Sequence, residues 1–173
     1  LMTMLASRQD VPVDLPPSES DLLLQYSRCR QDFRELGCAE CHVPSLAIED
    51  TEYTLISRTG GPDLSVDLLA NGAQPRLQPD VITGELRVPL YSDLKRHAMG
   101  EALAEPRGDA GVAADVFLTP PLWGIARSRP YLHDGRAPTL EDAVLLHGGE
   151  AQASRDAFAA LAEDDRAPPR VFL

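Results

Sequence analysis

The chain has 173 residues, of which 43% are hydrophobic and 5% aromatic, and its formal net charge is −11 at pH 7. This composition supports a folded domain and argues against a nucleic-acid-binding protein, because phosphate backbones are bound by clustered Lys and Arg side chains. It also argues against a membrane span, because no apolar run approaches the ~20 residues that a spanning helix needs.

The first residues of the chain are rich in proline, with Pro12, Pro16 and Pro17, which indicates an extended conformation. We expect residues 1–17 to form an extended leading segment that continues from an unseen upstream region. Residues 18–173 are then expected to form one domain.

The first predicted helix has Ser18 as its N-cap and Asp21 three residues later, in the manner of a capping box. It runs to about Leu36, where Gly37 ends it. One face of this helix carries residues at offsets of 4, 3 and 4, namely Leu22, Tyr26, Cys29 and Phe33. Because Cys29 lies on this face, we expect a buried and inert thiol there.

The middle of the chain, residues 43–90, shows no helical period and contains several Gly and Pro residues. It predicts a long wrapping loop with at most a short hairpin, and so long a loop is unusual unless it encloses something. After it we expect a short turn or helix over residues 91–99, a surface loop over 105–115, a helical turn over 120–126 and a tight turn over 131–136.

A second clear helix begins at its N-cap Thr139, with Asp142 at the third helical position, and Gly148 and Gly149 end it. Its inward face carries Leu140, Val144 and His147. A last helix is predicted over about residues 154–162. These elements together predict a mainly α fold with long irregular loops.

The cysteines point to a cofactor, because three of them cannot form a dense disulfide framework. Two of them lie in Cys38-Ala39-Glu40-Cys41-His42, and Cys-x-x-Cys-His is the attachment signature of a c-type haem. The two sulfurs bond one porphyrin as thioethers, and the adjacent His binds iron. We therefore predict one covalent haem c, tethered by Cys38 and Cys41, with His42 as the first axial iron ligand.

Two other interpretations of the cysteine pair remain open. A zinc site needs four ligands, typically with a second Cys or His pair at short spacing, whereas Cys29 is the one other cysteine here. A dithiol redox site places the pair at a helix start after a strand, whereas here a long helix leads into the pair.

The second axial position has several candidates. His147 is favoured, because it lies on an otherwise apolar helix face and the two glycines after it permit close approach of a haem. A core histidine that donates one hydrogen bond is the alternative interpretation of His147. The other candidates are His97, Met99, His133, Met2 and Met4.

Further side chains are expected around the haem. Trp123 and His97 are predicted to contact it, and Arg136 to neutralise a propionate, as Arg96 and Arg127 could also do unless they are ordinary surface arginines. His133 sits in a turn beside Asp134 and Arg136, which favours hydrogen bonding over iron ligation.

Several segments together resemble the di-haem oxidoreductase family, which is related to the bacterial di-haem cytochrome c peroxidases and to the tryptophan-tryptophylquinone maturation enzymes. In chain order these segments are Leu36–Leu46, Tyr91–Gly100, Thr119–Gly124, Leu132–Ala143 and His147–Ala151. They span about residues 33 to 151 in the order that this family has.

The resemblance implies a periplasmic protein with two cytochrome c-like domains, each with one haem, of which this chain resembles the carboxy-terminal one. In the relatives the ligand opposite the proximal His follows the His-Asp-Gly turn and is commonly Met or Tyr. The matching position here is His147, which would make a bis-histidine haem of lower potential.

We therefore expect a cytochrome c-like, mainly α haem domain that exchanges electrons with a second haem domain or partner chain and with an electron-donor protein. One rival is a peroxidase in which His147, His97 or Met99 leaves the iron on activation. The other is a zinc-stabilised interaction module without redox activity.

Overall fold

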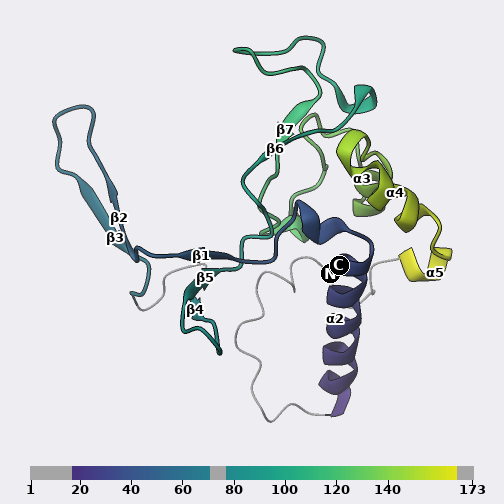
Figure 1. Cartoon of the computed structure of the whole chain (residues 1–173), viewed down its shortest axis with the longest axis horizontal. Helices are drawn as coiled ribbons and strands as arrows, with labels where there is room; N and C mark the ends of the chain where they lie inside the picture. Colours follow the sequence, from purple (N-terminus) through teal and green to yellow (C-terminus); the bar gives the residue numbers. More distant parts are fainter. Residues whose placement is uncertain (1–16, 71–76, 167–173) are drawn as a thin grey trace.

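The computed structural model describes residues 17–70 and 77–166 (Figure 1). Residues 1–16 of the predicted leading segment, which was expected over residues 1–17, and the candidate ligands Met2 and Met4 lie outside the described residues. The same is true of the side chains that were predicted to begin the first helix and form part of its apolar face, Ser18, Asp21, Leu22 and Tyr26.

Helix α2 (Pro17–Glu35) is the longest element and ends close to the predicted place. Gly37 adopts a left-handed φ of 80°, a conformation that glycine takes without steric cost, and so turns the chain out of the helix. The 3₁₀ turn η1 (Cys38–Glu40) follows directly. Phe33 is buried, whereas Cys29 is only half-buried, so its thiol is less enclosed than predicted.

The strands of the described residues form small antiparallel sheets. A three-stranded sheet has the order β1-β5-β4, β2 and β3 form a hairpin that projects from the rest of the chain, and β6 pairs with β7 (Figure 1). The strands are β1 (Leu46–Ile48), β2 (Glu52–Leu55), β3 (Leu64–Asp67), β4 (Gln78–Pro79), β5 (Leu86–Val88), β6 (Arg96–Ala98) and β7 (Val116–Leu118).

The predicted fold class, a mainly α cytochrome c-like helical domain, is therefore wrong. Strands β1 to β5 all lie within the stretch predicted as a wrapping loop, and its predicted hairpin exists as β2–β3. Strand β6 replaces the turn or helix predicted over residues 91–99. Strands of at most 4 residues are too short to show alternation, and β6 is fixed by the distant pairing of His97 with Phe117.

The remaining helical elements are short. No helix in the described ranges is both long and apolar enough to cross a membrane. The elements are η2 (Glu101–Leu103), η3 (Ile125–Arg127), α3 (Leu140–Leu145), η4 (Gly149–Ala151), α4 (Gln152–Ala159) and α5 (Glu163–Arg166).

Helix α3 begins with the predicted capping box. The Asp142 amide donates to the Thr139 hydroxyl at 3.0 Å, and the Thr139 amide donates to the Asp142 carboxylate at 3.2 Å. Two amides of the first turn thus have acceptors. The box fixes where α3 starts, and His147 lies between the end of α3 and the start of η4.

Two small groups of buried side chains form the core. One contains Phe33, Tyr91 and Leu122, and the other Tyr131, Ala137 and Ala143. Ile125 packs against both groups. Each group has only three buried side chains, and members of both groups line the same cavity.

We predict that Thr139→Ala lowers the free energy of unfolding by about 1 kcal/mol, because the Asp142 amide loses its acceptor. Urea denaturation of the parent and the variant measures this difference. Thr59→Ala, in an exposed turn, is the matched control and should change stability by less than about 0.5 kcal/mol. Equal losses in the two variants would contradict the role of the capping box.

Candidate functional site

The Cys-x-x-Cys-His segment forms one tight turn at the end of α2. The His42 amide donates to the Cys38 carbonyl at 3.0 Å, and the Glu40 amide donates to the Gly37 carbonyl at 3.1 Å. A Cβ on Gly37 would lie 2.7 Å from the Ser154 hydroxyl of α4, so the turn approaches that helix closely. The fold thereby places Cys38, Cys41 and His42 at the wall of one cavity.

This cavity has a volume of about 540 Å³, within the range of roughly 300–1,000 Å³ that cofactor pockets have. Its wall is mostly apolar and includes members of both core groups. It is built by α2, η1, β6, β7, the segment over residues 119–125, the turn over 130–133, α3 and α4. The apolar side chains include Phe33, Leu103, Phe117, Leu122, Ile125, Tyr131, Leu140 and Val144.

The imidazole of His42 is held by a backbone carbonyl. Its Nδ1 lies 3.0 Å from the Tyr91 oxygen, which can only accept, so Nδ1 carries the proton and Nε2 keeps its lone pair. Burial lowers the pKa of His42, and this outweighs the opposite effect of the bond to Tyr91. The neutral ring therefore presents a metal-binding nitrogen.

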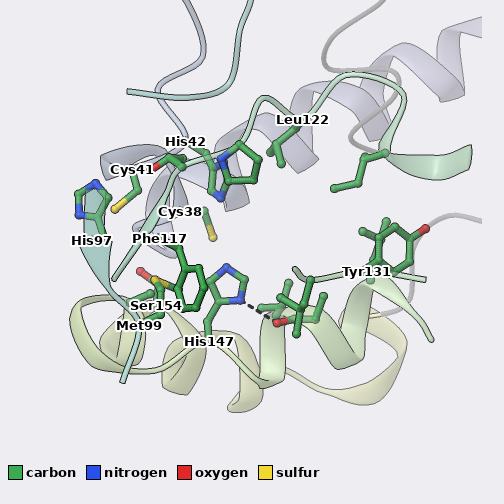
Figure 2. A pocket seen from close by; sticks show the side chains of 18 of the residues that line it. Cys38, Cys41, His42, His97, Met99, Phe117, Leu122, Tyr131, His147 and Ser154 are labelled. Carbon is green, nitrogen blue, oxygen red and sulfur yellow. Dashed lines mark hydrogen bonds between the residues drawn. The ribbon is translucent and has the colours of Figure 1, made fainter. Parts of the chain in front are cut away.

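His147 is held in the same way from the opposite wall. Helix α3 ends just before it, and its amide donates to the Val144 carbonyl, which leaves the Ala143 carbonyl to accept from Nδ1 of the ring at 2.7 Å. Among the residues that the structure describes, its Nε2 has no hydrogen-bond partner, as is also true of His42. Figure 2 shows the two imidazoles pointing toward one another, with Cys38 and Cys41 lining the same space.

This donor set fits a covalently bound haem. Two imidazole Nε2 atoms face each other, two thiols lie on the same wall, and the remaining lining is apolar. A partner that fixes the tautomer of each histidine is the usual companion of metal-binding imidazoles. His42 and His147 would bind iron, and Cys38 and Cys41 would hold the macrocycle.

The two alternative uses of the cysteine pair fit the site less well. Burial raises the pKa of both Cys38 and Cys41, whereas a dithiol redox site requires a lowered thiol pKa. Within residues 17–70 and 77–166, no group of three or more His, Cys, Asp or Glu side chains could hold a metal ion. A structural zinc site would need four such ligands.

His97 and Met99 also line the cavity, but they differ in what they can offer iron. Both ring nitrogens of His97 are bonded to carboxylates, Nε2 to Asp93 and Nδ1 to Glu150, so neither nitrogen is free. Met99 lies on the same side of the cavity as His147 in Figure 2 and stays an alternative ligand. The structure therefore favours His147 over His97 as the second ligand.

Of the other residues considered around the haem, Trp123 and His133 line the cavity and Arg136 does not. Trp123 lines the cavity while its indole donates to the Pro89 carbonyl at 2.7 Å, and His133 lines it while stacked on Phe117. Arg136 does not line the cavity and is bonded to Asp134 and to the Ala102 carbonyl.

Sequence reasoning missed several lining residues. Phe117 comes from strand β7, and Ser154 and Arg155 come from α4. The approach of these segments is set by long-range packing. The helix pattern could have revealed Arg155, because it lies three residues before Phe158 and therefore on the same face of α4.

Two glycines position His147 against strand β6. A Cβ on Gly148 would lie 2.9 Å from the Met99 carbonyl, and one on Gly149, which has a φ of 54°, would lie within clashing distance of the Ala98 carbonyl. Only residues without a side chain allow this approach. The sequence predicted that these glycines permit close approach of a haem, and the structure shows their close approach to the backbone of Ala98 and Met99.

We predict that Gly149→Ala loses more stability than its matched control Gly84→Ala. Both glycines have positive φ, so both variants incur a backbone cost of roughly 1–2 kcal/mol, but nothing lies near a Cβ on Gly84. The steric clash with β6 adds to the loss only at Gly149. Urea denaturation measures both variants, and equal losses would contradict the close packing of β6 against η4.

Comparison with known proteins gives one match. The family model described as "Di-haem oxidoreductase, putative peroxidase" matches residues 25–173, a stretch that contains the cysteine motif, both facing histidines and the whole cavity wall. No curated protein and no solved structure matches the chain.

Proposed function

Because the chain belongs to the di-haem oxidoreductase family, we propose that it is a periplasmic electron-transfer domain with one covalent c-type haem. The observation that carries this proposal is the pair of facing imidazoles, each with its Nδ1 proton donated to a backbone carbonyl. Its periplasmic location and its place as the carboxy-terminal haem domain follow from the resemblance of the sequence to di-haem peroxidases.

The side chains of the site divide the work of holding the cofactor. Cys38 and Cys41 would tether the porphyrin as thioethers, which would prevent its dissociation, and His42 and His147 would bind the iron. When bound, the haem supplies reversible one-electron chemistry at iron. The apolar wall would exclude water from the haem. The two fixed histidines would keep the structure around the iron nearly the same in both oxidation states.

Filled axial positions favour an electron carrier over a peroxidase. A haem with His42 and His147 both bound has no open position for peroxide. Ligation by two histidines also gives a lower potential than ligation by His and Met. The domain would therefore pass electrons to or from a second haem.

The second haem has to come from elsewhere. The 173 residues contain one Cys-x-x-Cys-His motif, whereas the family is described as di-haem. We propose a second haem domain or a partner chain, together with an electron-donor protein, as the partners of this domain.

A peroxidase is the second candidate, and the family description favours it. In this alternative His147 would leave the iron on activation, and Met99, which lies on the same side of the cavity in Figure 2, is another candidate for that role. The ferric spin state separates the two candidates. A resting high-spin fraction that reacts with peroxide would favour the enzyme, and a purely low-spin spectrum favours the carrier.

We predict that His147→Ala converts the ferric haem from low-spin to largely high-spin, because one axial ligand is lost while the tether remains. Optical and EPR spectra of the purified holoprotein measure this change. His133→Ala is the matched control, since His133 also lines the cavity but stacks on Phe117, and it should stay low-spin. An unchanged spectrum of the His147 variant would reject this ligand and favour Met99.

We also predict that Cys38→Ser with Cys41→Ser yields a protein without covalent haem, because each thioether bond uses one cysteine sulfur and neither sulfur remains. Mass spectrometry after denaturation measures whether the haem stays with the polypeptide. Cys29→Ser is the control and should retain the full haem mass, since this residue does not line the cavity. Loss of haem from the control alone would overturn the assignment of the motif.

A further inference from the structure

His97 is held between two carboxylates at the edge of the cavity. Its Nε2 lies 2.9 Å from the Asp93 carboxylate and its Nδ1 lies 2.8 Å from the Glu150 carboxylate. Carboxylates accept hydrogen bonds, so both ring nitrogens donate and the ring is an imidazolium. The bond to Glu150, followed by the bond to Asp93, raises the pKa of His97 accordingly. The His97 side chain is 16% exposed and the Asp93 side chain 7%, which strengthens the ion pair between them relative to surface pairs.

Asp93 belongs to the segment that fixes His42. The Asp93 amide donates to the Cys41 carbonyl at 2.9 Å, and the Ser92 amide donates to the Val43 carbonyl at 3.0 Å. Two residues before Asp93, the Tyr91 carbonyl accepts from the His42 ring. A displacement of Asp93 therefore moves the carbonyl that orients His42.

Glu150 belongs to the segment that carries His147. It follows His147 by three positions and lies in η4, where the preceding Gly149 touches strand β6. One Glu150 oxygen accepts from His97, and the other accepts from the Ala98 amide at 2.9 Å. Glu150 thus fastens the His147 segment to both the side chain and the backbone of β6.

We propose that His97 is a positioning residue that ties the His42 segment to the His147 segment and so keeps both imidazoles directed at the same iron. Figure 2 shows His97 beside Cys41 at the edge of the site, away from the line between the two facing histidines. From there it acts through Asp93 and Glu150 and does not touch the iron. This role rests on the proposed ligation of haem by His42 and His147.

The bonds on the two sides of His97 are not equivalent. Asp93 has a side chain that is 7% exposed, whereas the Glu150 side chain is 54% exposed. Although burial opposes it, hydrogen bonds from the Lys95 amide and from His97 lower the pKa of Asp93 to about 2, so this carboxylate is ionised. The buried pair with Asp93 is the anchor, and the exposed pair with Glu150 is the connection that a mild substitution can weaken.

The test measures how often His147 leaves the iron. Cyanide binds ferric haem only when an axial position opens, so its binding rate to the holoprotein reports that opening. His97→Ala should accelerate cyanide binding by about 10- to 100-fold, the range for losing a partner that orients a metal ligand. Its covalent haem content should stay at the parent level, because Cys38 and Cys41 are intact.

Two further variants make the test decisive. Glu150→Gln weakens one connection and should give a smaller acceleration than His97→Ala, and it replaces that variant if His97→Ala cannot be isolated folded. Thr139→Ala is the control for general destabilisation and should bind cyanide at the parent rate. A parent rate in His97→Ala and Glu150→Gln, or equal acceleration in Thr139→Ala, would overturn the positioning role.

The parent spectrum separates this role from the proposed function. A parent protein that is low-spin with covalent haem establishes the ligand pair, and the cyanide rates then decide the role of His97. A parent protein without covalent haem, or with a high-spin ferric haem, would overturn the proposed function and with it the positioning role.

Discussion

Each of two imidazoles in this protein donates its Nδ1 proton to a backbone carbonyl, and the rest of the site depends on that shared arrangement. The carbonyls of Tyr91 and Ala143 fix the tautomers, because a carbonyl oxygen can only accept a hydrogen bond and Nδ1 must therefore carry the proton. Both Nε2 atoms are then available toward the cavity. A histidine with the opposite tautomer would present a proton to iron and could not bind it.

The same cavity explains why the buried core is small. The buried groups around Phe33 and around Tyr131 are joined through Ile125, and both face a hollow of about 540 Å³. Apolar walls of this kind gain free energy when an apolar body removes them from water. Covalent haem would fill the hollow and connect the groups, so folding and cofactor attachment would reinforce each other.

The sequence predicted best what local chemistry decides. Three features depend on residues that are close in the sequence, and the structure contains each of them. They are the end of α2 near Gly37, the Thr139 capping box and the grouping of Cys38, Cys41 and His42. The sheets were missed because their strands are short and their partners distant, as with His97 opposite Phe117. Long-range packing also decides that Arg136, which does not line the cavity, donates to the Ala102 carbonyl and that Nδ1 of His97 is hydrogen-bonded to Glu150.

The ferric EPR and optical spectra of the purified holoprotein test the central claim most directly, because they report both axial ligands at once. Ligation by His42 and His147 predicts a low-spin ferric signal without the sulfur-to-iron charge-transfer band that a methionine ligand produces. A high-spin signal, or a low-spin signal accompanied by that sulfur band, would contradict the facing imidazoles as the iron ligands.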